Sequence, residues 1–351
     1  MHPKNLKILV IGTCSPHVAN HILRIKDEDT RIEVISNGRT HFSGEEPIHL
    51  VDFSLAKCWN LFLTTRRIKK LIININPDVI HIHQANSVAF YSILANRTLH
   101  VPTILTAWGS DILLNPQKNI LLKWMVRFTL RKTDFFTADS THLAQEMRKL
   151  VPDKSLDITV CNFGIAPIKM EVAKKKLIYS NRNHNPLYRI DLVIEGFERF
   201  SNTELGKDWK LVVAGSGSET EKLKSMVHAK GMSEKITFVG FVNKEQNFKN
   251  YAEASLFVSI PMSDATSISL LEAMYYKCIP VLSHLPANEE WVKDGDNGIL
   301  VKELSENYFK RALEIDLERV GEKNHAIILE QGTESVSRQK FKAVLFKAVS
   351  R

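Results

Sequence analysis

Short apolar runs alternate with helix-like segments along most of the chain. The first run, residues 6–12, is continuously apolar and ends at Gly12-Thr13, where a helix-like segment begins. Continuous apolar runs of this length are typical of strands that a parallel sheet buries on both faces, and the helices between them form the crossovers. The alternation therefore predicts an α/β fold of the doubly wound, Rossmann-like type. Further strands are expected at residues 31–36, 77–83, 101–106, 134–139, 176–182, 210–214, 236–242, 254–260 and 280–283.

The length and composition are those of a soluble protein with two domains. A chain of 351 residues can form two domains of ordinary size, each with its own core. Its 44% hydrophobic and 25% charged residues are ordinary for a globular protein and argue against disorder. No apolar run is long enough for a signal sequence or a membrane span, so we expect a cytoplasmic protein. The cysteines, which show neither metal nor disulfide spacing and so fit a reducing compartment, are Cys14, Cys58, Cys161 and Cys278.

Residues 261–274 join the apolar strand 254–260 to a helix through a polar turn. The first backbone N–H groups of a helix have no internal partners and lie at the positive end of its dipole, so they attract phosphate. Because the turn follows a strand, we expect it at the edge of the sheet where Rossmann-like folds bind ligands. The turn residues suited to cap the helix are Ser263, Asp264, Thr266 and Ser267.

Two acids stand eight residues apart in this stretch, Asp264 in the turn and Glu272 in the helix. A ligand with a diphosphate at the helix start would meet one carboxylate on each side, and carboxylates are common partners of paired sugar hydroxyls. The alternative is structural: Asp264 only caps the helix, and Glu272 is a solvated helical residue. An isolated acid pair favours this second interpretation, so the surrounding motifs have to decide.

The stretch resembles the acid-x7-acid motif of GT-B glycosyltransferases, in particular of the large retaining family four. Glu272 is followed by Ala273-Met274 and, after a short gap, by Pro280-Val281, as in that family. The family usually has glutamate as its first acid, where this chain has Asp264. The resemblance implies two Rossmann-like domains that face each other across a cleft, and sugar transfer with retention of configuration. No motif calls for a metal or another cofactor.

Other segments resemble the family in the same order. Residues 161–165 are similar to its crossing between the two domains, and the connection after them is basic and rich in turns. We therefore expect an N-terminal, acceptor-binding domain at residues 1–165 and a C-terminal, donor-binding domain at residues 166–334. In GT-B proteins the terminal helix often crosses back, so residues 335–351 are expected to pack toward the first domain.

The segments that carry His83 and Asp111 also resemble their counterparts in the family. Each follows a predicted strand, which places it at the edge of the sheet where ligands bind. Histidines in a parallel strand, such as His81 and His83, otherwise more often pack than catalyse. The catalytic residues that the resemblance implies are Asp264, His83 and Asp111.

Arg182 follows the first strand of the second half and matches the arginine that grips the donor diphosphate in the family. The family's diphosphate-binding lysine falls at Tyr188, beside Arg189, whose planar fork would keep the charge and suits phosphate. An arginine after a strand is otherwise commonly just exposed. The donor-binding candidates are Gly12, Thr13, Arg182, Arg189, Gly215, Thr266, Ser267, Ile268, Ser269 and Glu272.

The formal net charge is +8, and basic runs such as residues 66–70 and 123–132 suggest acidic partners. Both runs lie in the predicted acceptor half and have Leu, Phe or Trp nearby, which favours peripheral binding to the inner face of the plasma membrane. The alternative is that they are merely solvated. No exposed platform of the kind that binds nucleic acid is visible, so no nucleic-acid partner is expected.

These features predict a retaining glycosyltransferase that acts in cell-surface polysaccharide synthesis. It would move a sugar from a nucleotide sugar, a UDP- or GDP-sugar, to a glycan or lipid-linked glycan. One alternative is a nucleotide-sugar epimerase of the same fold, which product analysis without an acceptor would reveal. Another is a basic membrane- or nucleic-acid-binding protein without chemistry, for which the net charge is the only support.

Overall fold

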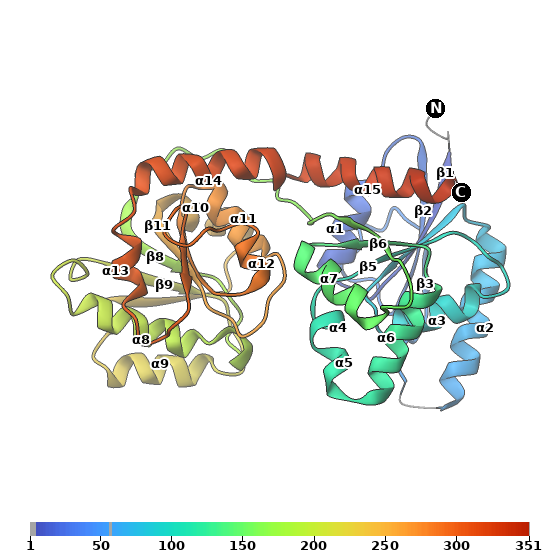
Figure 1. Cartoon of the computed structure of the whole chain (residues 1–351), viewed down its shortest axis with the longest axis horizontal. Helices are drawn as coiled ribbons and strands as arrows, with labels where there is room; N and C mark the ends of the chain where they lie inside the picture. The colour runs from blue at the N-terminus through green and yellow to red at the C-terminus, as the bar shows by residue number, and fades with distance from the viewer. Residues whose placement is uncertain (1–4, 56–57, 351) are drawn as a thin grey trace. The chain divides into compact units, whose positions relative to one another are not determined.

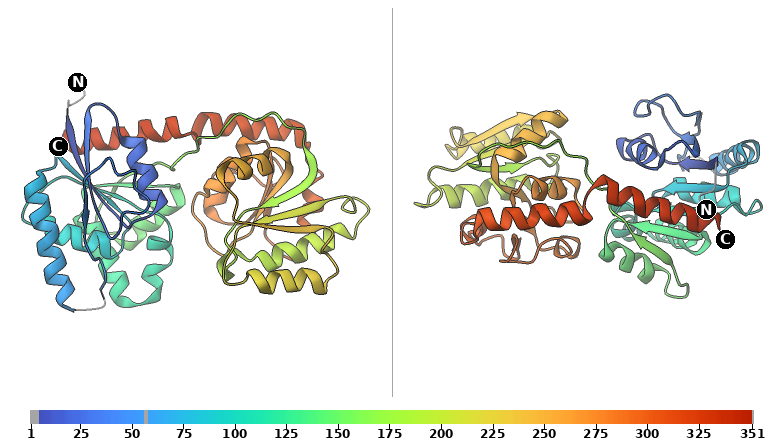
Figure 2. Two further views of the ribbon diagram at one scale, coloured as in Figure 1. Left: turned by 180° about the vertical axis from the view of Figure 1, so that it is seen from behind. Right: turned by 90° about the horizontal axis from the view of Figure 1, so that it is seen from above.

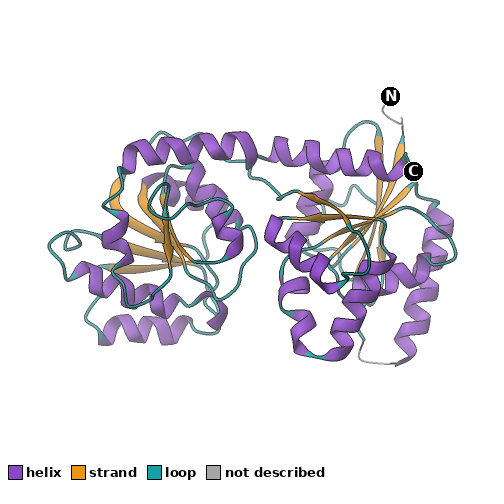
Figure 3. Cartoon of the chain, viewed as in Figure 1, coloured by secondary structure: helices purple, strands orange, loops and turns teal. Residues whose placement is uncertain are grey.

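The computed structural model describes residues 5–55 and 58–350, and the chain divides into two compact units (Figure 1). Unit 1 comprises Met1–Phe163 and Glu334–Arg351, and unit 2 comprises Gly164–Thr333. In each unit a twisted sheet lies between layers of helices (Figure 3). The predicted α/β architecture of two Rossmann-like units is confirmed.

The sheet of unit 1 is entirely parallel, in the order β3-β2-β1-β4-β5-β6-β7. The order reverses between β1 and β4, and the carboxyl ends of parallel strands flanking such a reversal form the usual ligand crevice of a doubly wound fold. Here those two ends carry Gly12 and His83. The strands are β1 (Leu6–Ile11), β2 (Thr30–Ser36), β3 (Ile48–Leu50), β4 (Val79–His83), β5 (Thr103–Thr106), β6 (Phe135–Ala138) and β7 (Asp157–Val160).

Side-chain caps start several helices of unit 1. The Ser15 and Ser140 hydroxyls accept from the backbone N–H of Val18 and Leu143, which supplies acceptors for N–H groups that a helix start leaves unpaired. The helices are α1 (Pro16–Ile25), α2 (Cys58–Ile75), α3 (Ser87–Asn96), α4 (Ser110–Leu113), α5 (Asn115–Lys118), α6 (Ile120–Lys132), α7 (Thr141–Leu150) and α15 (Glu334–Val349).

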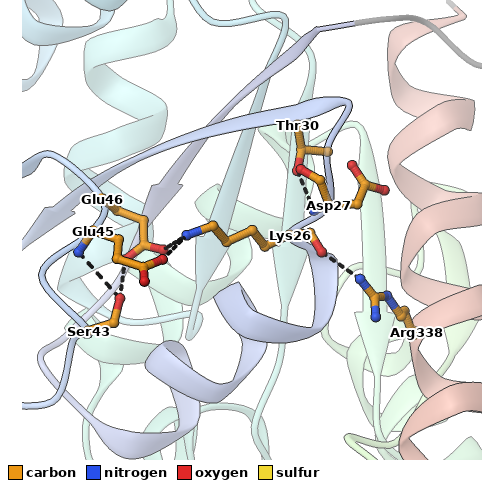
Figure 4. Close-up of polar contacts among 7 residues, drawn as sticks. All are labelled: Lys26, Asp27, Thr30, Ser43, Glu45, Glu46 and Arg338. Carbon is orange, nitrogen blue, oxygen red and sulfur yellow. Dashed lines mark hydrogen bonds and ion pairs between the residues drawn. The ribbon is translucent and has the colours of Figure 1, made fainter.

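The terminal helix α15 is part of unit 1, although the chain reaches it only after unit 2. Phe341 and Leu345 are buried in the same apolar cluster as β1 and α1. Arg338 donates to the carbonyl oxygen of Lys26 at 2.5 Å, just beyond the end of α1 (Figure 4). Lys342 pairs with Asp27 nearby. Apolar burial and these polar contacts together hold the helix to this unit.

The sheet of unit 2 is also entirely parallel, in the order β10-β9-β8-β11-β12-β13. Figure 2 shows the ribbon of each unit from two further sides. The order reverses between β8 and β11, so their carboxyl ends lie side by side. The strands are β8 (Lys175–Ser180), β9 (Lys210–Ala214), β10 (Ile236–Gly240), β11 (Ala254–Ser259), β12 (Ile279–Ser283) and β13 (Ile299–Val301). The helices are the 3-10 turn η1 (Pro186–Tyr188), α8 (Ile190–Ser201), α9 (Thr220–Ala229), α10 (Lys244–Glu253), α11 (Ile268–Tyr275), α12 (Pro286–Glu289), α13 (Tyr308–Ala312) and α14 (Leu317–Gln331).

Three strands, β3, β7 and β13, were not predicted. β3 and β13 have three residues each, and β7 begins at the exposed Asp157 and has no buried residue. All three lie at the edges of their sheets, where one neighbouring strand suffices and a continuous apolar run is not needed. β3 and β7 therefore lack the buried apolar run that identifies central strands, and β13 has such a run but is only three residues long.

Replacing Gly196 with alanine is expected to destabilise unit 2. Gly196 is buried in α8, and a Cβ placed there would lie 1.8 Å from the hydroxyl oxygen of Tyr308, which is itself 1% exposed. Overpacking of this kind costs about 1–3 kcal/mol, measured here as a lower urea midpoint. Alanine at the neighbouring, half-buried Glu195 is the matched control and should leave the midpoint nearly unchanged. Equal midpoints for the two variants would contradict the packing argument.

Candidate functional site

The turn between β11 and α11 carries the predicted first acid. Asp264 lies three residues before Ser267, the N-cap residue of α11, whose side chain makes no capping hydrogen bond. The Asp264 Oδ1 atom accepts from the backbone N–H of Ala265 at 3.0 Å. Asp264 is therefore not the N-cap residue of α11, and the N–H groups of the first turn of α11 receive no side-chain cap from Ser267.

Arg182, two residues after β8, reaches this turn. Its Nη2 atom donates to Asp264 Oδ2 at 2.7 Å, and its Nη1 atom donates to the Ser267 hydroxyl. The guanidinium also lies over the ring of Tyr188, 4.4 Å from its centroid, an attractive cation–π arrangement. Only 9% of Arg182 is exposed. A buried cation is thus held between an aromatic face and an anionic turn.

Arg189 occupies a different position. It stands at the start of α8 in the left-handed region, with φ of 49°, and its guanidinium donates to the carbonyl oxygens of Ile260 at 2.7 Å and Pro261 at 2.9 Å. Burial lowers the pKa of Arg189. Its charge is thus engaged at the carboxyl end of β11, where it holds the backbone that leads into the polar turn.

Gly215 lies at the carboxyl end of β9, against the backbone of Arg182. Its φ is 107°, and a Cβ there would lie 2.6 Å from the Arg182 carbonyl oxygen. Only glycine permits both this conformation and this approach. The other donor-binding candidates lie in the turn and at the start of α11: Thr266, Ser267, Ile268 and Ser269. The Thr266 hydroxyl accepts from Trp291 Nε1 at 3.4 Å.

Glu272, the second predicted acid, points into a largely buried polar cluster. The Asn247 amide nitrogen donates to Glu272 Oε2 at 3.2 Å, and the Tyr251 hydroxyl also hydrogen-bonds to this carboxyl group. Burial nevertheless dominates and raises the pKa of Glu272 to about 7. The carboxyl group can therefore change its charge near neutral pH, which a solvated helical residue would not do.

The partners of Glu272 were not predicted as functional residues. Tyr179 and Asn181 each donate to the Asn247 amide oxygen, at 2.7 and 3.1 Å, which leaves the amide nitrogen of Asn247 to face Glu272. Asn181 also donates to the Tyr251 hydroxyl at 2.8 Å. Asn247 and Tyr251 are four residues apart in α10 and so share one helix face. That spacing was the available signal, but it is equally typical of a packing face.

In unit 1, Gly12 and His83 lie together at the ends of β1 and β4. A Cβ on Gly12 would be 3.3 Å from the Cβ of His83, and Thr13 is half-buried in the turn that follows. His83 is fully buried, and its Nδ1 accepts from Trp108 Nε1 at 3.3 Å. Burial lowers the pKa of His83 well below its ordinary value, so its imidazole is neutral at neutral pH.

Asp111 braces the loops around this histidine. Its Oδ2 accepts from the backbone N–H of Ala85 at 2.7 Å and its Oδ1 from that of Trp108 at 3.0 Å, while the residue is 2% exposed. Burial raises the pKa of Asp111, and these backbone N–H groups oppose that shift. Asp111 thus fixes two loops, including the one that presents Trp108 to His83.

Three buried histidines in unit 1 have the spacing of metal ligands. His21, His81 and His83 offer ring nitrogens that lie within 4.8 Å of one another. Both nitrogens of His81 have partners, because Nδ1 lies 3.2 Å from His21 Nε2 and Nε2 lies 2.7 Å from the Thr106 hydroxyl. Burial lowers the pKa of His81 to about 3. Because both ring nitrogens of His81 already have hydrogen-bond partners, the cluster as it stands is one of neutral imidazoles packed in the core.

The candidate residues thus form two groups. Unit 2 brings Arg182, Asp264, Ser267 and Gly215 together around one turn, with Glu272 one helical turn further along α11. Unit 1 gathers Gly12, Thr13, His83 and Asp111 at the ends of its central strands. Among the described residues, no helix is both long enough and apolar enough to cross a membrane.

Comparison with known families identifies both halves of the chain. Residues 166–329 match the family of group 1 glycosyl transferases, and residues 7–140 match a glycosyl transferase 4-like family. The predicted family is therefore confirmed.

Individual relatives are distant. The chain is 26% identical over 244 residues to N-acetyl-alpha-D-glucosaminyl L-malate synthase of Bacillus anthracis, which covers 64% of this chain and 61% of that protein. It is 23% identical over 268 residues to an N-acetylgalactosaminyltransferase of Campylobacter jejuni that acts on a diphospho-undecaprenol-linked sugar, covering 71% and 70% of the two chains. The match thus spans less than two thirds of the first of these relatives.

Solved structures support the same fold. HepE of Anabaena, crystallised with UDP-glucose, superposes with a TM-score of 0.79 over 98% of this chain and all of that one, at 13% identity. Sucrose-phosphate synthase of Thermosynechococcus elongatus gives a TM-score of 0.78 over 98% and 99% of the two chains, at 11% identity. With the two family matches, these similarities show that the chain belongs to the group 1 glycosyltransferases of the GT-B fold and is a transferase enzyme.

Proposed function

We propose that the protein moves a sugar from a UDP- or GDP-sugar to a glycan or lipid-linked glycan, with retention of configuration, in the synthesis of a cell-surface polysaccharide. The observation that carries the proposal is the buried Arg182–Asp264–Ser267 contact at the start of α11, with Glu272 in the same helix. Relatives that bind UDP-glucose or act on a lipid-linked sugar support the substrate classes.

The proposal assigns the donor to the predicted domain at residues 166–334, which nearly coincides with unit 2, because each polar group there suits one part of a nucleotide sugar. Arg182 and the N–H groups of Ile268 and Ser269 would stabilise the leaving diphosphate, without a metal. Gly215 leaves room for it, and Thr266 and Ser267 border it. Glu272 would accept hydrogen bonds from the ribose hydroxyls, and Asp264 from those of the sugar. Arg189 would keep the turn in place through its two carbonyl contacts.

The acceptor is assigned to unit 1. His83 would contact the reacting group of the acceptor, Gly12 and Thr13 lie beside this histidine at the end of β1, and Asp111 would act through the two loops that it holds. The bond from the anomeric carbon to the diphosphate oxygen breaks, and a bond from that carbon to the acceptor oxygen forms. A nucleoside diphosphate and the proton of the acceptor hydroxyl leave. Binding both substrates in register supplies much of the rate increase.

A panel of nucleotides and nucleotide sugars tests the donor assignment. A ligand that binds the folded state raises its apparent melting temperature, by an amount that grows with concentration above Kd. We expect UDP or GDP and the matching sugar nucleotide to raise it, and adenosine nucleotides to do so less. Release of nucleoside diphosphate that depends on an acceptor would support transfer. Conversion of the sugar nucleotide to its epimer without an acceptor would favour the epimerase, and no shift with any nucleotide would contradict both.

We also propose that unit 1 binds peripherally to an anionic membrane, such as the inner leaflet of the plasma membrane, and one surface of the unit supports this. The amino-terminal ends of α2 and α6 lie at the same end of unit 1 (Figure 1), and α3 packs against both helices. Large apolar side chains are exposed there, with Ile120 86% exposed, and exposed basic side chains flank them. We call this set the apolar-basic patch: Phe62, Leu63, Arg66, Arg67, Lys118, Ile120, Leu121, Lys123 and Trp124.

Vesicle binding tests the apolar-basic patch. Each basic residue near an anionic bilayer contributes about 1 kcal/mol, so four or more can hold the protein reversibly. We expect sedimentation with anionic but not neutral vesicles, weakened by added salt, and about tenfold weaker binding for the double variant Ile120→Ser/Trp124→Ser. Leu23→Ser removes an exposed apolar side chain of α1 outside the patch and is the matched control. Binding that ignores lipid charge and salt would contradict the proposal.

A further inference from the structure

Arg182 has an anionic partner within its own unit. The Asp264 carboxylate and the Ser267 hydroxyl take one donor from each terminal nitrogen of its guanidinium, and both acceptors lie on the turn at the start of α11. A carboxylate oxygen and a phosphate oxygen are equivalent acceptors for a guanidinium. Asp264 therefore occupies the face of Arg182 that a diphosphate at this helix start would need.

No neighbouring candidate cation replaces Arg182 in the competition between Asp264 and a diphosphate. Arg189 is committed to the carbonyl oxygens of Ile260 and Pro261. Tyr188 stands at the family's lysine position and stacks its ring on Arg182, 4.4 Å from the guanidinium carbon, so it restrains the arginine but brings no charge. Of the cations predicted to bind a diphosphate, Arg182 alone faces the turn, and its charge is already balanced by Asp264.

Asp264 is the partner better placed to move. The Arg182 side chain is 10% exposed and packed under Tyr188, whereas the Asp264 side chain is 21% exposed and belongs to an irregular turn. Its other fixed contact is the N–H group of the adjacent Ala265, which would move with the same turn. Loss of the ion pair without a replacement would leave a buried cation uncompensated, so an incoming anion has to take over the contact as Asp264 leaves it.

We propose that Asp264 is an internal counter-ion that the donor diphosphate displaces from Arg182, which frees its carboxylate for the sugar. The inference rests on the proposed function. It makes Asp264 a specificity residue as well as a sugar contact. A free nucleoside diphosphate displaces the Asp264 carboxylate without providing a new hydrogen-bond donor for it. An intact sugar nucleotide provides sugar hydroxyl groups, from which the carboxylate can accept hydrogen bonds. The same contact therefore disfavours the product and favours the donor.

Removing the charge of Asp264 should therefore increase the affinity of the protein for a free nucleoside diphosphate. Asp264→Asn keeps the size and hydrogen-bonding capacity of the side chain but no longer neutralises Arg182. Its affinity for a free nucleoside diphosphate should rise about tenfold, the scale of relieving one close repulsion between like charges. Its preference for the intact sugar nucleotide over the free diphosphate should fall below that of the wild type, because the amide is a weaker acceptor for sugar hydroxyls.

Calorimetric titration of the full-length protein tests this, with UDP and UDP-glucose, and with GDP and GDP-mannose. The matched control is Asp208→Asn, which removes the partner of Lys176 (3.0 Å) near the amino end of β9, away from the carboxyl ends that carry the turn. Tighter diphosphate binding by Asp264→Asn, with unchanged binding by the control, supports the inference. Equal or weaker binding by Asp264→Asn than by the wild type overturns it. Wild-type protein that binds none of the four ligands refutes the proposed function itself, an outcome distinct from the previous one.

Discussion

A Glu272→Gln variant is expected to bind the donor sugar nucleotide about 30-fold more weakly than the wild type near pH 8, because hydrogen bonds to a carboxylate contribute about 1.5–3 kcal/mol each and those to an amide contribute less. Burial raises the pKa of Glu272 to about 7, and ribose hydroxyls bind best to its ionised form. Wild-type affinity should therefore fall as the pH drops below about 7, and that of the variant should not. The measurement is a titration at several pH values with an intact sugar nucleotide, whose diphosphate has no group that titrates near neutrality.

The pH dependence of the free energy of unfolding also reports on the Glu272 carboxyl group, and it can be measured without a ligand. Because its pKa is higher in the folded protein than the ordinary value of 4.5, the folded state holds the proton more tightly. The resulting stabilisation is fully present below about pH 4.5 and is lost as the pH rises through about 7. Glu272→Gln should remove this dependence and raise the urea midpoint near pH 8 relative to the wild type. Equal affinities and parallel stability profiles for the two proteins would refute the role given to Glu272.

Asp264→Ala is expected to lower turnover about 10- to 100-fold, the kinetic equivalent of losing one charge-assisted hydrogen bond to the sugar. Asp264→Glu restores the acid usual in the family and should keep measurable activity or change the preferred sugar. Turnover of each variant with a set of UDP- and GDP-sugars is the measurement. Because the alanine variant leaves the buried Arg182 without its partner, its unfolding must be followed in parallel.

Ser263→Ala is the matched control for Asp264, since it changes the adjacent side chain of the same turn. It should retain turnover within about twofold of the wild type, as surface substitutions away from special contacts usually do. Wild-type turnover by a folded Asp264→Ala protein, with each donor that the protein accepts, would remove Asp264 from the mechanism.

Local sequence pattern was sufficient to predict the fold and the elements on which several candidate residues lie. The central strands of both sheets are continuous apolar runs, and their burial on both faces follows from that composition. The acids Asp264 and Glu272 could be placed on a strand–turn–helix unit because such a unit is specified by neighbours in sequence. Gly215 at the end of β9 could be recognised for the same reason. Edge strands such as β3 carry no such pattern and were missed.

Contacts between distant segments lay outside the reach of sequence reasoning. Arg182 and Asp264 are 82 positions apart and meet only because β8 and β11 are neighbours in the sheet. Arg189 looked like a diphosphate ligand, yet its guanidinium holds two carbonyl oxygens, a choice that depends on the path of the backbone after β11. The sequence carries no functional signal for Asn247. Its amide nitrogen faces Glu272 because Tyr179 and Asn181 both donate hydrogen bonds to its amide oxygen, and these residues come from another part of the chain.

By itself the sequence determined two α/β units with parallel sheets, the family, and the strand–turn–helix unit that carries Asp264 and Glu272, since each depends on residues close together in the chain. Only the tertiary structure decided the charge state and the partners of the site. It buried Glu272 deeply enough to raise its pKa to about 7, and it paired Arg182 with Asp264. Desolvation and ion pairing depend on what surrounds a side chain from every direction, and most of those neighbours come from other strands and helices.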